Sequence, residues 1–345
     1  MARFLGIPQN LTNNLDLSTY TLINSACFGT IGATILSATN ASFAAGQRIY
    51  IAQMRGTSVG KVEDNQIVSY VAGTITLAHP LENTYSSTGD SKAQVVVVPE
   101  AGTSSGVINV PAWDGTVGGL FVMAVINAGG NINVSEKGYR GGAGGLLAGN
   151  QGEGTAGPGG ADADPNGTGG GSGTNFQNTT PSGGGHVTAG QSGIGSTGGD
   201  AVGDVTLADI YMGGAGGGAS ASGGPGIVGG TGGRSGGIAV VYAYRLLSTL
   251  VITSNGQNGL LSANGEFGGA GGSAGSILAK CVENLGATLT AIKGTGANGS
   301  IGDGKDGADG RIRIETCLNT VGSENPTASL SEGGHNYCAS ILQMI

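Results

Sequence analysis

Charged residues, prolines and long apolar runs are all scarce in this sequence of 345 residues. Asp, Glu, Lys and Arg make up 10% of the chain and leave a net charge of −8. Binding to nucleic acid or to anionic membranes needs clustered Lys and Arg, so we expect neither. The longest apolar run, from Leu120 to Ile126, is far shorter than the roughly 20 residues that span a bilayer, so we expect no membrane insertion. Nine prolines are too few for a collagen chain.

Cysteine is also rare. The four cysteines form no C-x-x-C pair and show no metal-ligand spacing, so we expect buried free thiols. Cys281 and Cys317 lie in successive copies of a repeat described below, which raises the question of a disulfide between them. Strand parity argues against it, because Cys281 shares a strand face with Ile277, whereas Cys317 lies opposite the face of Ile312. Whether the cysteines form other disulfides stays open.

The sequence offers no catalytic constellation. Its three histidines, His79, His186 and His335, lie far apart, and none belongs to a nucleophile or metalloprotease motif. Matches to G-x-G-x-x-G arise by chance where glycine is so frequent, so they indicate no nucleotide site. We therefore expect a chain that is not an enzyme and that holds no cofactor and no metal.

One segment partly matches a calcium-binding loop. Asp162, Asp164 and Asn166 occupy alternate positions ahead of a glycine, as in the first half of such a loop. The twelfth position is Gly173 and not the bidentate Glu that completes the site. A solvated turn is therefore favoured, and calcium binding by these three residues stays an open alternative.

Glycine is the residue in excess, with 73 copies. In the runs GYRGGAGG, GEFGGAGG and GKDGADG it often recurs at every third position, which is the period of a polyproline II helix. Such a helix has no internal hydrogen bonds and must pair laterally with its neighbours. The glycine-rich insert at about 141–236 is therefore predicted to form a packed polyglycine II helix bundle. Asp303, Asp306 and Asp309 follow the same period and are expected to solubilise an edge.

The predicted fold is mainly β, with little or no α-helix. Residues 1–112 contain the strand-like runs QRIYIAQM, QIVSYVAGTITL, AQVVVVP and GVINVPAW, so we expect an N-terminal β-domain there. Residues 113–345 are expected to form a glycine-rich β/polyglycine II repeat domain that contains the insert. LFVMAVI and IAVVYAY are apolar on both faces and predict interior strands, whereas RIRIE alternates and predicts a strand that covers an outer surface.

The repeats of the second domain share one order of parts. A glycine pair or a single glycine opens an apolar strand, a second strand follows, and a glycine run closes the unit. Copies begin at Gly118, Gly236 and Gly275, and the half unit GRIRIETCL begins at Gly310. The insert lies between the first copy and the second.

An ordered series of segments resembles a family of glycine-rich phage tail and bacterial surface proteins. The series is FAAGQRIYIAQMRGT from Phe43, GTITLAHPLENTYS, AQVVVVPE, PAWDG, GYRGG and GRIRIE, and it spans about residues 43–318. The insert is also similar to the tip adhesins of some phage long tail fibres, in which polyglycine II helices present variable loops to a bacterial surface receptor. The resemblance implies a virion protein of tail-fibre or surface-fibre type that mediates host attachment or fibre architecture. Its implied partners are other virion subunits, further copies of itself, and a host cell-surface glycan or protein.

The start of the chain bears on its location. MARFLGIPQN lacks a basic region followed by an apolar core, so we expect no signal peptide. A phage virion protein is made in the cytoplasm and leaves the cell by lysis. The expected location is therefore the virion or the extracellular space.

Receptor-contact side chains are expected where the glycine insert is interrupted. The candidates are Asn175, Phe176, Gln177, Asn178 and His186. Exposed aromatic and amide side chains on loops are groups that receptors engage; the alternative is that Phe176 fastens its loop to a neighbouring helix. Two other functions stay open. One is a subunit of an extracellular bacterial filament or surface layer without a receptor role, and a remote one is an ice-binding protein.

Overall fold

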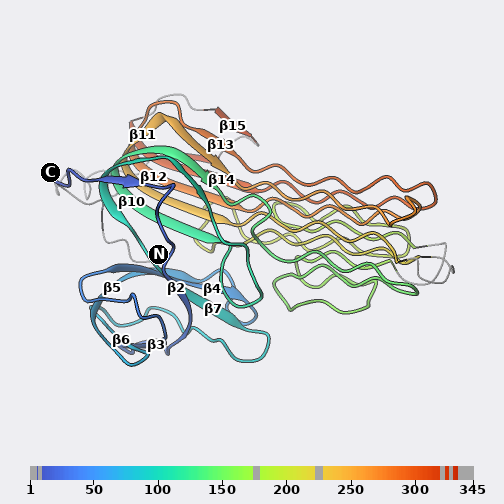
Figure 1. Cartoon of the computed structure of the whole chain (residues 1–345), viewed down its shortest axis with the longest axis horizontal. Coiled ribbons are helices and arrows are strands. Elements are labelled where there is room, and N and C mark those ends of the chain that lie inside the picture. Colours follow the sequence, from blue (N-terminus) through green and yellow to red (C-terminus); the bar gives the residue numbers. More distant parts are fainter. Residues whose placement is uncertain are drawn as a thin grey trace.

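The computed structural model describes residues 6, 10–173, 179–221, 228–318, 323–325 and 329–332. The regular elements of these residues are all β-strands, β1 to β16, which confirms the predicted mainly β fold. They form a closed barrel and a large sheet, from which the glycine-rich segments extend as an elongated bundle (Figure 1). No helix in the described ranges has the length and apolarity needed to cross a membrane.

The barrel closes in the order β2-β3-β6-β5-β4-β7 through antiparallel pairs. Its strands are β2 (Asn24–Phe28), β3 (Ile35–Ala38), β4 (Arg48–Arg55), β5 (Val62–Val71), β6 (Thr74–Leu77) and β7 (Lys92–Val97). Along β4 alternate residues point to opposite sides. Ile49 and Ile51 belong to the cluster inside the barrel, whereas Tyr50 and Ala52 pack against the large sheet. The barrel therefore covers one face of that sheet.

The large sheet is a stack of parallel rungs, each of which runs through one layer, turns back and continues in a second layer. The strands are β1 (Asn14–Asp16), β8 (Glu100–Ser105), β9 (Val107–Asn109), β10 (Leu120–Asn133), β11 (Ile238–Thr253), β12 (Ser276–Asn284), β13 (Thr288–Thr290), β14 (Arg311–Leu318), β15 (Ser323–Asn325) and β16 (Ser329–Glu332). In the first layer β8, β10, β11, β12 and β14 pair in that order. In the second layer β9, the ends of β10 and β11, β13 and β15 pair in the same order.

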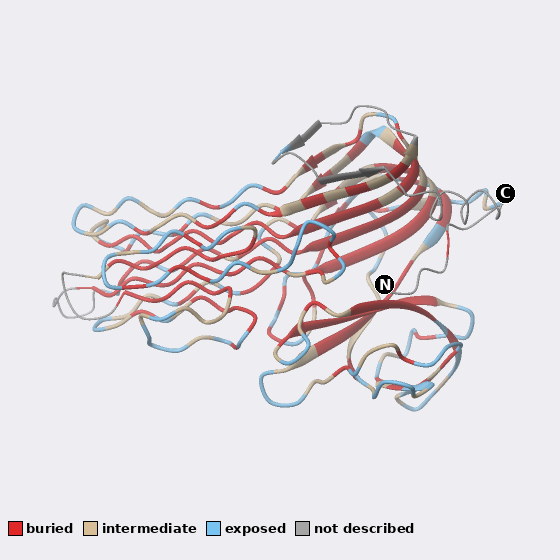
Figure 2. Ribbon diagram, turned by 180° about the vertical axis from the view of Figure 1, so that it is seen from behind, coloured by how far each residue is buried: buried red, intermediate tan, exposed pale blue. Residues whose placement is uncertain are grey.

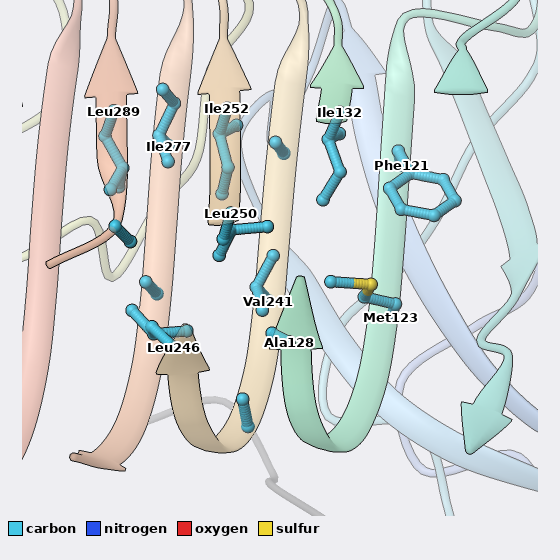
Figure 3. Close-up of a cluster of buried hydrophobic side chains, with 14 of the residues drawn as sticks. Phe121, Met123, Ala128, Ile132, Val241, Leu246, Leu250, Ile252, Ile277 and Leu289 are labelled. Carbon is cyan, nitrogen blue, oxygen red and sulfur yellow. The ribbon is translucent and has the colours of Figure 1, made fainter. Parts of the chain in front are cut away.

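Apolar side chains fill the space between the two layers (Figure 3). Phe121 and Met123 come from the first layer, and Ile132 and Leu250 come from the second; all four are fully buried. A buried side chain of this size contributes about 1.5–3 kcal/mol. The other face of β10 is buried too, because Leu120 and its outward neighbours pack on the barrel. This explains why the run LFVMAVI is apolar throughout, as an interior strand was expected to be.

The strand pairing crosses the domain boundary that the sequence predicted. β8 and β9 pair with β10, so they form a first rung of the sheet although they precede the expected boundary at residue 112. β14 alternates as the sequence predicted, with Ile312 and Ile314 buried and the charged residues between them partly exposed, and two of these charged residues also contact the insert. Arg311 donates a hydrogen bond to the Val202 carbonyl at 2.9 Å, and Arg313 donates one to the Val205 carbonyl at 3.1 Å.

The glycine bundle is joined by lateral backbone hydrogen bonds that repeat every three residues. Gly213, Gly216 and Ala219 donate to Gly236, Gly233 and Gly230 in one neighbouring segment. The intervening residues donate to two other segments, with Gly214 and Gly217 bonded to Gly185 and Ser182, and Ala215 and Gly218 bonded to Glu153 and Asn150. The same segment accepts bonds from Gly142, Gly170 and Ala270 on three further segments. A donor direction that recurs after three residues requires an extended chain with three residues per turn.

This packing leaves no room for side chains between neighbouring segments. A Cβ atom placed on Gly214 would lie 1.7 Å from the Thr168 carbonyl oxygen, and one on Gly144 would lie 1.8 Å from the Gly229 oxygen. Figure 2 shows that the interior of the bundle is buried and that exposed residues gather on its outer segments and turns. Glycine is therefore required by the close approach of the backbones.

The cysteines follow the sequence prediction only in part. Cys27 and Cys281 are buried free thiols, and burial raises the pKa of both thiols. Cys281 lies in one core cluster with Ile277, so strand parity was right. Cys317 is disulfide-bonded and is not the free thiol that was expected. Because Cys281 is free, the two are not joined to each other.

Candidate functional site

The bundle ends, far from the sheet, in a set of turns that we call the distal tip. It comprises residues 145–149, 193–196, 260–268 and 298–303, together with Val228. The runs that lead to the turns 145–149, 260–268 and 298–303 follow β10, β11 and β13, whereas the turn 193–196 lies within the insert between β10 and β11 (Figure 1).

Hydrogen bonds between the segments join these turns into one surface. Gly229 N donates to the Gly145 carbonyl at 3.1 Å, and Leu260 N donates to the Thr231 carbonyl at 2.8 Å. Gly268 N donates to the Gly302 carbonyl at 2.8 Å. Ile194 is fixed separately, because its amide donates to Thr180 Oγ1 at 2.9 Å. Backbone bonds therefore join the turns at Gly145, Leu260 and Gly302, and a side-chain bond holds the turn at Ile194.

Large aliphatic side chains project from the distal tip into solvent. They are between 46 and 63% exposed and comprise Leu146, Leu147, Ile194, Val228, Leu260, Leu261 and Ile301. Phe267, the aromatic residue of the turn 260–268, is instead buried against Ala219 and Ala221. Clustered exposed apolar residues usually mark an interaction surface. Sequence reasoning missed these residues, although GLLAG, SGIGS and GSIGD each place large apolar residues among small ones.

The predicted contact residues are placed only in part. Asn175, Phe176, Gln177 and Asn178 lie outside the described residues, so their role stays a prediction. The described residue before them, Gly173, donates to the Gly218 carbonyl at 2.9 Å in the central segment of the bundle.

His186 does not suit the contact role that the sequence predicted. Its side chain is fully buried, and its Nε2 atom lies 3.1 Å from Ser276 Oγ at the start of β12. Burial and the nearby Arg311 charge lower the pKa of His186 to about 4. The prediction of an exposed receptor contact is therefore wrong for this residue, which packs at the sheet end of the bundle.

A buried carboxylate connects the bundle to the barrel. Glu153, from the glycine insert, forms an ion pair with Arg55 of β4. It also accepts hydrogen bonds from Trp113 Nε1 at 3.0 Å and from Arg140 Nε at 2.9 Å. The Glu153 and Trp113 side chains are each 1% exposed. A charge this deeply buried is tolerated only when it is paired and hydrogen-bonded, so the cluster fixes where the bundle leaves the body of the molecule.

A second connection lies beside this cluster. Ile210 N donates to the Gly60 carbonyl at 2.9 Å, and Lys61 Nζ lies 2.8 Å from Asp209 Oδ1. The Tyr211 ring packs against Gly60, where any larger residue would collide with it. The end of the bundle opposite the tip is therefore bonded to the barrel both at Arg55 of β4 and at Gly60 and Lys61 in the loop that follows β4.

The calcium-like segment is used internally. Asp162 Oδ1 accepts a hydrogen bond from Asp164 N at 3.2 Å, and Asn166 Nδ2 donates to the Gly157 carbonyl at 2.6 Å. Within the described ranges no group of three or more His, Cys, Asp or Glu residues is arranged to hold a metal ion.

The aspartates at every third position have a role beyond solubility. Asp309 Oδ1 accepts a hydrogen bond from Lys293 N at 3.1 Å, and Asp306 Oδ1 accepts one from Gly296 N at 3.0 Å. On the other side of the same segment, Asn258 Oδ1 accepts from Thr295 N at 2.9 Å. These side chains therefore bind backbone amides of the segment 293–296 from the segments on either side of it.

Comparison with known proteins does not assign this chain to a family. No protein-family model matches the sequence, and no curated protein matches it. Among solved structures, one match is the Gp54 tailspike of the Acinetobacter baumannii bacteriophage AP22, in complex with a capsular saccharide of A. baumannii. The sequence identity is 10% and the TM-score is 0.21. The match covers 90% of this chain and 57% of the tailspike, so the chain corresponds to little more than half of that protein's length.

One expectation from the sequence is withdrawn. The absence of a catalytic constellation led us to expect that the chain is not an enzyme, and a match to a tailspike that holds a saccharide contradicts that expectation.

Proposed function

We propose that this chain is a structural protein of a phage virion, of tail-fibre or surface-fibre type, that contributes to host attachment through its distal tip. The observation that carries the proposal is the separation of parts along the molecule. Exposed apolar side chains gather on the turns at one end of the bundle, and the anchoring contacts with the barrel gather at the other.

The physics of the bundle supports this division. Its interior consists mainly of small residues, so it fixes the position of a surface without supplying the side chains that recognise anything. Specific contacts must therefore come from the turns, where Leu147 and Leu260 are more than half exposed. A rigid support lowers the entropy cost of binding, because the contact surface is ordered before the partner arrives. The proposed partner is a glycan or a protein on the host surface.

The proposal is tested by attachment to cell envelopes. The purified chain is mixed with envelope fractions from candidate hosts, and its affinity is compared with that of a Leu147→Ser, Leu260→Ser variant. We expect a loss of at least about tenfold, or 1.4 kcal/mol, because both side chains would leave a desolvated contact. Thermal melting should not change, since both residues are exposed.

The matched control is Val107→Ser. Val107 is also about half exposed but lies on β9, away from the tip. It should keep full attachment. A tip variant that binds envelopes as well as the unaltered chain contradicts the proposed tip function, and a chain that binds no envelope but assembles into free filaments supports the filament alternative.

The predicted contact segment is tested separately by Phe176→Ala. If Phe176 is a receptor contact, the variant should lose attachment and keep its melting temperature. If it instead fastens the loop, the variant should melt earlier and attach normally.

A further inference from the structure

Two long segments of the barrel contain no charged residue. Residues 24–47 and 65–79 contain no Asp, Glu, Lys or Arg, in a chain whose net charge is −8. These residues include β2, β3, β6 and most of β5. β3 and β6 lie on the side of the barrel directed away from the large sheet (Figure 1). The two acidic residues of β5, Glu63 and Asp64, are fully buried and do not reach this surface.

Strand register shows which side chains share this surface. Phe28 pairs with Ser37, Ser37 pairs with Thr74, and Thr74 pairs with Val71. Directly paired residues point to the same face of a sheet. The alternate residues, such as Leu36 and Ile75, fill the barrel interior. The row that starts at Phe28 therefore points outward along its whole length.

A second row runs beside the first. Ile35 pairs with Thr76, and Thr76 pairs with Ser69. Val68 lies at the irregularity in β5 next to this row. We call the two rows, together with Val68 and with Ile31 from the loop between β2 and β3, the outer barrel face.

The outer barrel face exposes large apolar side chains. Phe28, Ile31, Ile35, Val68 and Val71 are between 47 and 70% exposed. Together they offer on the order of 500 Å² of apolar surface, a size at which patches on soluble proteins are often functional. The residues between them carry hydroxyl groups.

We infer that the outer barrel face is the contact between two copies of this chain, related by a two-fold axis. Copies that each carry a net charge of −8 repel one another, and the repulsion is weakest where neither surface carries a charge. In a two-fold contact the same patch meets itself, so it must be self-complementary. Apolar groups satisfy this condition, and so do Ser and Thr hydroxyls, because each can donate and accept. The inference concerns assembly and does not depend on whether the tip binds a host.

The experiment measures the mass of the full chain in solution by sedimentation equilibrium over a range of concentrations. The unaltered chain should have twice the mass of one chain at the upper concentrations. Val71→Glu and, separately, Phe28→Glu should each raise the dimer dissociation constant at least about tenfold, because a charge would be buried without a partner. Both positions are exposed in the single chain, so melting of the monomer should change little.

The matched control is Val107→Glu, which introduces the same charge at an exposed position on β9, outside the outer barrel face. It should leave the dimer intact. The inference is overturned if the unaltered chain is a monomer at all concentrations, or if its mass corresponds to three or more copies. It is equally overturned if both glutamate variants remain dimers with unchanged affinity.

Discussion

The rungs of the large sheet and the glycine bundle are held together by opposite means. Between the two layers of rungs, side chains such as Phe121 and Leu250 exclude water and pack against one another. In the bundle almost no side chains meet, and the backbone of Gly213–Ala219 bonds to neighbouring segments on all sides. The same chain thus contains one region that depends on having side chains and one that depends on lacking them.

The energies of the two regions differ accordingly. A buried apolar side chain in the rungs contributes about 1.5–3 kcal/mol. A lateral hydrogen bond in the bundle contributes a net 0.5–1.5 kcal/mol, roughly, against about 1–2 kcal/mol for ordering each residue. The bundle therefore has little margin of its own and depends on a complete bonding pattern and on its base, where Glu153 and Arg55 bind it to the barrel. The rungs should be sensitive to the removal of side chains, and the bundle to their addition.

The largest expected effect is in the rungs. Phe121→Ala should lower the free energy of unfolding by about 4 kcal/mol, because it removes a large buried ring and leaves a cavity. Denaturant unfolding followed by circular dichroism measures this change. Val107→Ala, at an exposed position, should cost less than about 0.5 kcal/mol. Equal costs for the two variants would show that the space between the layers is not a packed core.

The converse change in the bundle is Gly214→Ala. The added methyl group would lie 1.7 Å from the Thr168 carbonyl oxygen, so two segments must separate, at a cost of about 3 kcal/mol. Gly160→Ala is the matched control, because a Cβ atom there meets nothing within 4 Å. Thermal melting of both variants provides the comparison. If both variants have the melting temperature of the unaltered chain, the segments do not approach as closely as the structure shows.

A smaller effect is expected from pH at the junction of the two regions. The pKa of His186 is 6.5 in the unfolded chain and about 4 in the folded one, so the unfolded state binds the proton more tightly between these values. Stability should therefore be full above pH 6.5 and fall as the pH is lowered towards 4. The loss is about 2 kcal/mol at pH 5. A His186→Gln variant should lack this part of the pH dependence, and identical pH profiles for the two proteins would contradict it.

Local patterns predicted much of the fold. Runs that are apolar on both faces predicted the central strands, and the alternation around Cys281 and Ile277 predicted which face points inward. Glycine at every third position predicted extended segments. These features follow from the period of the backbone and need no knowledge of distant partners.

Features that depend on distant partners could not be predicted in this way. β8 has the sequence EAGTSS, which carries no strong strand signal, and it becomes a rung only by pairing with β10. His186 and Glu153 are polar residues among glycines, a pattern typical of solvated loops. Their burial depends on Ser276 and Arg55, about 90 or more positions away in the sequence. The aliphatic tip was missed because its members occur singly or in pairs in distant parts of the sequence and meet only after the segments have packed.

The most direct test of the contrast between the two regions is amide hydrogen exchange, measured residue by residue by NMR. If backbone hydrogen bonds hold the bundle, the consecutive amides of Gly213–Ala219 should all be protected, because each donates to a neighbouring segment. In an edge β-strand, by contrast, alternate amides have no neighbouring strand and are open to water. Protection of the amides in β10 and β11 together with rapid exchange throughout Gly213–Ala219 would contradict the account.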